Sequence, residues 1–396
     1  MRLYNIFVKF TNIYIASWAP SSTLHLKEYY RALARWESVY FKRREIRTWL
    51  KDMQVKNIDY LPESINVIEG QFDNRLFFRV SEDGLIILSQ PAEDPEKDAQ
   101  RLEQFLNKKM INLWDNLFSR GAARPKVFDE IESRHPLLLT VSKATSAEME
   151  KFFEIFNTIP HKKIDLEQGE VWIGENLAVI NNSRFNQDVL DKAVEHLLFA
   201  RVYEIQLERF VKGYEVLWNK VEGIRNQKYF QQQDLPVVHD RILNIQNQAN
   251  FFRARLNQMQ HFLDWRGKLI DEYVLDSNLN ETFKRFFMSL HSSQKYLQEL
   301  WAMLANYINS TVSLINFLYS DSEHKNLANL QKLFLVSTVA AIISLGGLLM
   351  VDVYRVLVFG GLAITVSILV YFLLFRILAR YKKISIFQKN IELPGD

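Results

Sequence analysis

The stretch Leu333–Val351 has the sequence LFLVSTVAAIISLGGLLMV and contains no charged residue. A second uncharged run, VLVFGGLAITVSILVYFLLF, follows at Val356–Phe375. At about 1.5 Å per residue, each run is long enough to cross a hydrocarbon core of roughly 30 Å as a helix. Because only Asp352–Arg355 separates the runs, the sequence predicts a tight antiparallel transmembrane hairpin at residues 332–376.

Basic residues on both sides of this hairpin predict its orientation. Lys332 precedes the first run, and Arg376, Arg380 and Lys382 follow the second. Lysine and arginine accumulate on the cytoplasmic side of membrane spans. We therefore expect a multi-pass protein of the cell inner (plasma) membrane, with cytoplasmic N- and C-termini and a basic cytoplasmic tail at residues 377–396.

A long helix is expected to lead into the first span. No glycine or proline occurs from Lys268 to Leu345, so this stretch lacks the residues that usually break helices. Five apolar side chains and one threonine recur there at heptad spacing. They are Phe283, Leu290, Leu297, Leu304, Thr311 and Leu318. The pattern predicts one helix over Glu281–Val351, and the alternative is two helices with a bend near Ser320–Ser322.

Two further helices are predicted beside it. Apolar residues recur at helical spacing in Asn186–Asn226 and in Asp240–Val274. The three helices would form a stalk at residues 183–331. An apolar face left uncovered on this stalk would meet other copies of the chain, so we expect a homo-oligomer.

The N-terminal part, residues 1–182, mixes strand and helix patterns. The candidate strands are Tyr4–Phe10, Asn12–Ala16, Leu76–Val80, Leu85–Leu88, Leu137–Val141 and Val171–Ile180, the last with a turn at Gly174–Asn176. The candidate helices are His25–Asp52, Asp94–Ser119 and Ser146–Phe156. Thr145 and Glu148 have the spacing of a capping box at the third helix. The fold class is therefore α+β: a cytosolic α/β domain, a helical stalk and a membrane hairpin.

The composition and the missing motifs exclude several kinds of functional site. The chain has no cysteine, which removes disulfides, thiolate metal sites and cysteine nucleophiles. Its net charge of +3 is too small to indicate DNA or RNA as a partner. Sequence motifs for a phosphate-binding loop, a dinucleotide fold, a zinc protease or a serine hydrolase are also missing. We expect a protein that is not an enzyme.

Three basic sets are candidates for binding an anionic ligand such as a nucleotide. They are Lys42, Arg43, Arg44 and Arg47; Arg120, Arg124 and Lys126; and Arg253 and Arg255 after Phe251–Phe252. Arginine forks suit phosphate groups, and a nearby aromatic ring can stack on a base. The alternative interpretation is ordinary solvated surface charge.

Small and polar residues form a stripe that enters the first apolar run. In steps of three and four, it comprises Asn326, Asn329, Leu333, Ser337, Ala340, Ser344 and Gly347. Polar groups within a bilayer face protein or water. The stripe therefore predicts either a pore lined by one helix per subunit or close helix packing, with hydroxyls bonded to carbonyls one turn back. Asp352 would form a carboxylate ring at the outer pore mouth or pair locally with Arg355.

This arrangement resembles the CorA-type metal transport family. The residue-level match is Lys332-Leu333, Ser337-Thr338 and Ser344, which are similar in spacing to polar positions of that family's pore helix. The resemblance implies a homopentamer with the first span lining the pore and the cytosolic domain gating it. The chain departs from the family at two places. Val351–Val353 stands where the family has the Gly-Met-Asn motif that recognises hydrated Mg²⁺, and Ile342 lies in the region where the family has a proline.

CorA-like proteins without that motif include those encoded beside type III CRISPR systems, in which a nucleotide messenger acts on a membrane protein. The resemblance thus implies a ligand-gated channel or effector in antiviral defence. Its partners would be the lipid bilayer, other copies of the chain and a nucleotide messenger. The alternatives are a CorA-type divalent metal transporter that binds Mg²⁺, a membrane-tethered sensor or scaffold without a pore, and a tethered enzyme.

Overall fold

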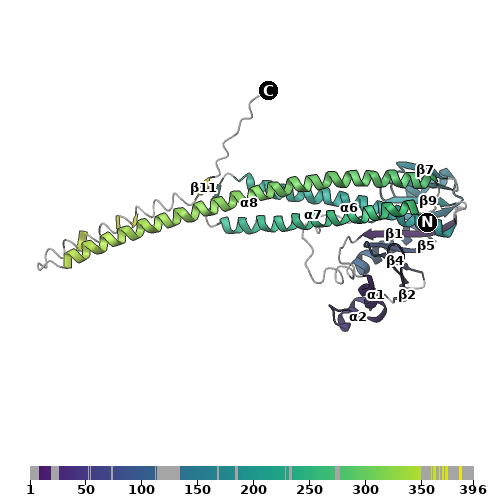
Figure 1. The fold of residues 1–396 in the computed structure, drawn as a ribbon, viewed down its shortest axis with the longest axis horizontal. Helices are drawn as coiled ribbons and strands as arrows, with labels where there is room; N and C mark the ends of the chain where they lie inside the picture. Colours follow the sequence, from purple (N-terminus) through teal and green to yellow (C-terminus); the bar gives the residue numbers. More distant parts are fainter. Residues whose placement is uncertain are drawn as a thin grey trace, which may run out of the picture. The chain divides into compact units, whose positions relative to one another are not determined.

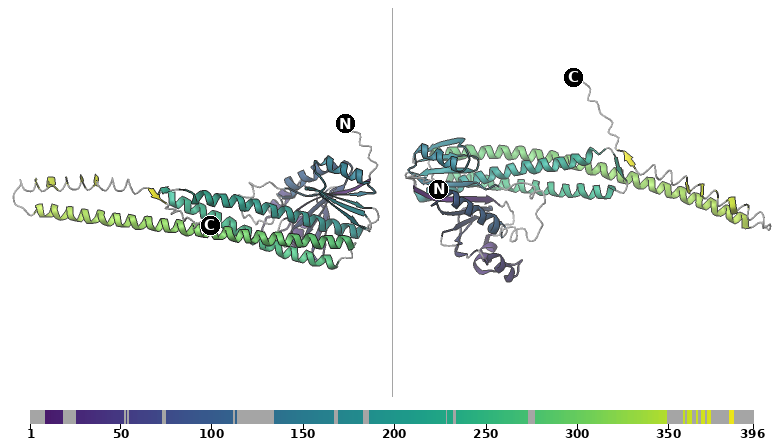
Figure 2. Two further views of the ribbon diagram at one scale, coloured as in Figure 1. Left: turned by 90° about the horizontal axis from the view of Figure 1, so that it is seen from above. Right: turned by 180° about the vertical axis from the view of Figure 1, so that it is seen from behind.

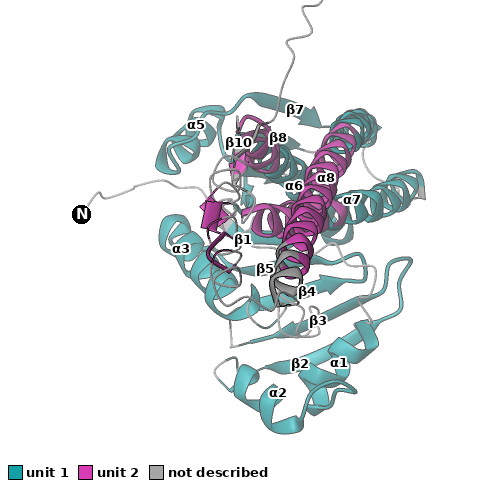
Figure 3. Cartoon of the chain, turned by 90° about the vertical axis from the view of Figure 1, so that its left-hand side faces the viewer, with its two compact units in different colours: residues 1–215, 251–302 teal, residues 216–250, 303–396 magenta. Residues whose placement is uncertain are grey.

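The computed structural model describes most of the chain between residues 9 and 348. The described residues are 9–18, 26–51, 53, 55–72, 75–111, 113, 134–166, 169–182, 186–227, 229–231, 234–272, 277–348, 358, 360–362, 365, 368–369, 371–372 and 383–385. The chain divides into two compact units, which Figure 3 shows in separate colours. Unit 1 comprises residues 1–215 and 251–302, and unit 2 comprises residues 216–250 and 303–396.

A mixed β-sheet organises unit 1. Its strands are β1 (Lys9–Trp18), β2 (Lys56–Leu61), β3 (Val67–Gln71), β4 (Phe77–Ser81), β5 (Leu85–Pro91), β6 (Leu137–Ser142), β7 (Lys162–Leu166), β8 (Gly169–Ile173) and β9 (Leu177–Asn182). Among the described residues they lie in the order β2-β3-β4-β5-β1-β6-β9-β8-β7. The central strands β6 and β9 are parallel, whereas the other neighbours are antiparallel.

Shorter helices cover one face of this sheet. They are α1 (Leu26–Arg35), α2 (Arg43–Leu50), α3 (Pro95–Phe105), which continues as the π-helix η1 (Leu106–Met110), and α5 (Ser146–Ile155). Side chains alternate across a strand, so Ile68, Val80 and Ile86 join one core with Leu33 and Leu102 of these helices. Within unit 1, the long helices lie against the opposite face, where Trp18 of β1 contacts Phe199 and Tyr203 (Figure 2).

Several expectations for residues 1–182 are confirmed. Strands start or end within a few residues of the predicted limits at β4, β5, β6, β8 and β9, with the turn at Gly174 between the last two. A side chain on Gly174 would meet the Phe153 ring at 2.8 Å, which explains the glycine. The capping box is present, since Thr145 Oγ1 accepts from the Glu148 amide at 3.4 Å and Glu148 accepts from the Thr145 amide at 2.8 Å.

Other expectations are wrong. The predicted helix His25–Asp52 is two helices, because the chain turns at Trp36, whose φ is +57°. The break predicted between Phe10 and Asn12 is only an irregularity within β1, which includes Asn12–Ala16, and residues 4–8 of the predicted strand Tyr4–Phe10 lie outside the described residues. The predicted helix Asp94–Ser119 is helical where it is described, but Leu106–Met110 is π-helical rather than α-helical, and residues 112 and 114–119 lie outside the described residues. Strands β2, β3 and β7 were not predicted.

Three long helices complete the fold: α6 (Gln187–Arg225), α7 (Leu235–Glu272) and α8 (Ser277–Leu348) (Figure 1). Their presence confirms the three helical patterns. Because α8 is a single helix of 72 residues, the alternative of a break near Ser320–Ser322 is wrong. The predicted heptad residues, from Phe283 to Leu318, are all buried. The domain limits at residues 182 and 331 stay predictions.

Unit 2 contains the end of α6, the start of α7 and the rest of α8. Trp218 stacks on Tyr307 with ring centroids 4.7 Å apart, and Gln246 donates a hydrogen bond to Asn309 at 2.9 Å. A short strand, β10 (Tyr229–Gln231), pairs antiparallel with β11 (Lys383–Ser385). These contacts hold the three helices of this unit together.

In the described part of the chain, none of the helices combines the length and the apolar character needed to cross a membrane. Most of the second predicted span, Val356–Phe375, lies outside the described residues, as do residues 349–357, Asp352 included, and most of the predicted tail.

Candidate functional site

A groove of about 1010 Å³ lies on unit 1 between strands β1–β5 and the first turns of α6. The sheet register sets its floor. Asp59 lies opposite Glu69, Glu69 opposite Arg79, and Arg79 opposite Ile87. Directly opposed residues of neighbouring strands share a face, so these four side chains form one row across the strands.

The groove carries an excess of negative charge. Six carboxylates line it, against two basic side chains, Arg79 and Lys192. The carboxylates are those of Asp59, Glu63, Glu69, Asp188, Asp191 and Glu195. Burial raises the pKa of Asp191 above its ordinary value, and the charges of Asp188 and Glu69 act in the same direction. A positively charged partner would relieve this repulsion. We call this surface the acidic groove.

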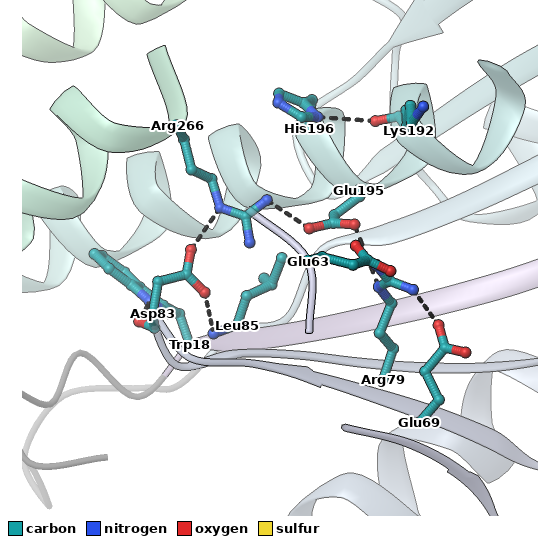
Figure 4. A network of polar contacts seen from close by, with 10 residues as sticks. All are labelled: Trp18, Glu63, Glu69, Arg79, Asp83, Leu85, Lys192, Glu195, His196 and Arg266. Atoms are coloured by element: carbon teal, nitrogen blue, oxygen red, sulfur yellow. Dashed lines mark hydrogen bonds and ion pairs between the residues drawn. The ribbon is translucent and has the colours of Figure 1, made fainter. Parts of the chain in front are cut away.

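A buried ion-pair network lies directly behind the acidic groove (Figure 4). Arg266 of α7 is fully buried, with Nε 2.5 Å from Asp83 Oδ2 and Nη1 2.7 Å from Glu195 Oε1. The other oxygen of Glu195 lies 3.3 Å from Nε of Arg79, which also pairs with Glu63 and Glu69. Glu195 therefore connects the groove with the interior, and it connects α6 with both α7 and the sheet.

The members of this network keep one another charged. Burial alone would raise the pKa of Glu195, but the guanidinium groups of Arg266 and Arg79 outweigh burial and lower its pKa. Burial alone would lower the pKa of Arg266, but Asp83 and Glu195 outweigh it and raise its pKa. Buried ion pairs give little net stability, yet they fix geometry because losing one partner leaves an unpaired buried charge.

A second buried path starts at the same hairpin turn. The indole of Trp18 donates to the Asp83 carbonyl at 2.6 Å and stacks on Tyr203 of α6. The Tyr203 hydroxyl donates to Gln294 of α8, whose amide donates to the Leu256 carbonyl of α7 at 2.7 Å. The β4–β5 turn thus contacts α7 directly, α6 through Arg266 or Trp18, and α8 through Trp18 and Tyr203 in succession.

The network gives a prediction for pH dependence. Burial, followed by the charge of Arg266, lowers the pKa of His196 to about 4. Between an unfolded-state pKa near 6.5 and pH 4 the unfolded chain binds more protons, so stability is full above this window and falls as the pH drops. His196→Gln should therefore flatten the acid side of a plot of the unfolding midpoint against pH. The stability that His196 costs the wild-type protein at pH 4, relative to neutral pH, is roughly 3 kcal/mol.

His135 offers an internal comparison for this titration. Burial also lowers its pKa to about 4. A chain with both His135→Gln and His196→Gln should lose more of the acid sensitivity than either single variant, because the two contributions are separate. An acid limb of unchanged steepness in the His196→Gln protein would contradict this assignment.

The predicted ligand-binding residues fall on different elements. Arg43, Arg44 and Arg47 lie on α2, and the guanidinium carbons of Arg43 and Arg47 lie 6.0 and 4.7 Å from the ring centre of Trp36. Arg253 and Arg255 lie on α7. The guanidinium of Arg255 covers the ring of Phe251 at 5.1 Å, and burial lowers its pKa. Arg120, Arg124 and Lys126 lie outside the described residues.

The predicted pore residues lie on the last part of α8. Asn326, Leu333 and Ser337 are exposed and Asn329 is half-buried within the single chain. The Ser337 hydroxyl donates to the Phe334 carbonyl at 2.9 Å. This is the hydrogen bond that the close-packing interpretation expects. Ala340 and Ser344 belong to the same helix, but their side chains are not among those that the structure describes.

Sequence reasoning missed both the acidic groove and the network behind it. The Asp83–Gly84 pair between two predicted strands is a hairpin signal that could have located the turn. Its contact with Arg266, 183 residues later, has no local signal. No group of three potential metal ligands from His, Cys, Asp and Glu is assembled within the described ranges.

The chain has weak similarity to two solved structures. The soluble domain of CorA from Methanocaldococcus jannaschii matches at a TM-score of 0.22 and 10% identity, over 45% of this chain and 86% of that one. The full-length CmaX protein matches at a TM-score of 0.20 and 13% identity, over 62% and 90%. No protein-family model and no curated protein matches the sequence.

Proposed function

We propose that the chain is a membrane-anchored homo-oligomer, a CorA-like channel or effector, in which an event on the sheet domain acts on a C-terminal membrane hairpin. The observation that carries this proposal is the continuity of α8. Its first part, including Phe283, Leu297 and Trp301, is buried in unit 1, and the same helix continues to Leu348 within the apolar run.

Exposed apolar side chains near the end of α8 support the membrane part of the proposal. Leu333, Phe334, Leu335, Val339 and Ile342 are all exposed, Phe334 at 73%. A helix that is apolar on all sides needs lipid or protein around it. Met303, Phe317 and Leu327, earlier on α8, are also exposed and provide apolar surface for neighbouring copies.

The acidic groove supports the coupling part of the proposal. Lys192 and Glu195 line the groove and belong to α6, and Glu195 pairs with Arg266 on α7. An occupant of the groove therefore contacts side chains that position two of the long helices. Such coupling requires an occupant that binds the two states of the oligomer with different affinity.

The chemistry of the two charged surfaces separates candidate ligands. The acidic groove repels the phosphates of a nucleotide, whereas Arg43, Arg44 and Arg47 beside Trp36 suit them. A nucleotide messenger of a defence system would therefore bind outside the acidic groove. A divalent metal transporter remains the alternative with the same architecture.

A tethered sensor or scaffold without a pore is a second candidate, favoured by one observation. The hydroxyls of Ser337 and Thr338 both donate to the Phe334 carbonyl, at 2.9 and 2.8 Å. Hydroxyls that are satisfied within their own helix do not require water or an ion beside them. In this alternative, the polar stripe serves only helix packing.

The variant Ser337→Leu distinguishes these candidates. If Ser337 lines a pore, the larger apolar side chain should abolish ion flux through the protein in liposomes, while the mass of the detergent-solubilised particle stays unchanged. Val339→Leu, on the same helix, is the matched control and should retain the flux. Full flux with Ser337→Leu would refute the pore-lining role. A loss of flux accompanied by a smaller particle would instead assign Ser337 to packing.

A further inference from the structure

An exposed basic and aromatic surface lies around the junction of α1 and α2. We call Trp36, Val39, Tyr40, Arg43, Arg44 and Arg47 the basic patch. Val39 is 80% exposed, and the rings of Trp36 and Tyr40 are also exposed. Clusters of arginine and aromatic side chains are enriched in the cores of protein interfaces. The patch thus combines apolar contact area with positive charge.

The basic patch and the acidic groove are complementary in charge and in contact chemistry. The segment from Arg35 to Lys51 contains six basic and two acidic residues, whereas the lining of the groove contains six acidic and two basic residues. The groove also contains the exposed ring of Phe77, which offers an apolar surface to Trp36, Val39 or Tyr40. Complementary patches of this kind steer association and fix its register.

The patch cannot reach the groove of its own chain. Tyr30 of α1 packs edge-on against Tyr60 of β2, and Ile46 of α2 is buried in the core on that side of the sheet. Asp59, the neighbour of Tyr60 in the strand, points to the opposite face and lines the groove. The two surfaces therefore lie on opposite faces of the sheet, beside its edge strand β2.

We propose that the acidic groove of one copy receives the basic patch of the next copy, so that the sheet domains associate head to tail. A contact between two different surfaces repeats from copy to copy and closes into a ring when the rotation permits. This inference rests on the proposed homo-oligomer and names the surfaces through which its sheet domains meet. The neighbour would add positive charge to a groove in which only Arg79 and Lys192 balance six carboxylates.

The absence of cysteine makes a direct test possible in the full-length protein in detergent. A chain with Val39→Cys in the patch and Ser64→Cys in the groove should form a ladder of linked copies with a bifunctional maleimide. Either single cysteine variant should form no bands above a dimer. A pair of thiols on one chain cannot produce the ladder without contact between copies, so the bands report the proposed interface.

Charge reversal then tests the chemistry of the contact. In the double-cysteine chain, Arg43→Glu with Arg47→Glu should lower the linked fraction at least about tenfold, and Asp59→Lys with Asp188→Lys should do the same. All four substitutions together should restore the ladder. Lys151→Glu with Lys212→Glu, which changes the net charge of unit 1 equally at exposed positions elsewhere, is the matched control and should leave the ladder intact.

The outcomes separate this inference from the proposed function. Three results would overturn the patch–groove contact. They are a ladder that survives Arg43→Glu with Arg47→Glu, a ladder that is lost in the control variant, and a ladder that is not restored when all four charge reversals are combined. An oligomeric particle that gives no ladder overturns the contact and leaves the proposed function standing. A monomeric particle overturns both.

Discussion

Replacing Arg266 with Met should destabilise the protein by about 3–5 kcal/mol, because it removes the cation paired with the buried Asp83 and leaves Glu195 with Arg79 alone. Asp83 and the guanidinium of Arg266 are fully buried, and the Glu195 side chain is largely buried. Water cannot replace the lost guanidinium at Asp83 without opening the packing around Trp18 and Phe199, whose rings contact Tyr203 and Arg266. The midpoint of urea unfolding of the detergent-solubilised chain measures the effect.

Two comparison variants test the cause. Arg285→Ala breaks an ion pair with Glu281 in which both side chains are exposed, and it should cost less than about 1 kcal/mol. Adding Asp83→Asn and Glu195→Gln to Arg266→Met removes the unpaired charges and should recover part of the loss. Equal midpoints for Arg266→Met and Arg285→Ala would show that the network does not hold the turn and the helices as described.

The variant Trp301→Ala should cost a similar amount, about 3–5 kcal/mol, through loss of packing. The Trp301 ring is fully buried, stacks on Phe252 of α7 at 4.7 Å and meets the edge of Tyr214 of α6 at 6.1 Å. It thus joins the three long helices within unit 1. Truncation to alanine would leave a cavity between them, which a shift in the thermal unfolding temperature would reveal.

Two other substitutions separate packing from polarity in this test. The indole nitrogen of Trp301 is buried, and no described atom accepts its hydrogen bond. Trp301→Phe loses no such bond and should therefore cost much less than Trp301→Ala. Tyr296→Ala, at a position 62% exposed on the same helix, should change stability by less than about 1 kcal/mol. If Trp301→Ala behaves like Tyr296→Ala, the three helices do not depend on this contact.

The long helices could be predicted because their determinants are local. The absence of glycine and proline, together with heptad spacing from Phe283 to Leu318, specifies both the helix and its buried face. The break at Trp36 could not be predicted in this way. A tryptophan is a rare choice for a left-handed backbone conformation, and no glycine, proline or asparagine marks the site. Ile46 and Leu50 of α2 are buried in the same core as Leu33 of α1, a contact that the local sequence around Trp36 does not indicate.

The candidate site was beyond sequence reasoning for a different reason. Its row of side chains depends on the pairing of β2, β3 and β4. Neither β2, which has no buried residue, nor β3, which is mostly half-buried, carries a strong alternating strand pattern. The excess charge of the groove arises only when Asp59 and Glu69 meet Asp188 and Asp191 from a helix more than a hundred residues later. Contacts over such separations leave no periodic signal.

The buried turn between β4 and β5 has a consequence for engineering this molecule. Turns at hairpin tips are usually the places where a chain accepts an epitope tag, a fluorescent domain or new termini. Here the turn residue Asp83 is bonded to Trp18 and Arg266, so an insertion would have to pass through packed helices. Labels for imaging this protein should therefore be placed elsewhere. A circularly permuted chain with its new termini at this turn should fail to fold, because the buried contacts of Asp83 would be lost.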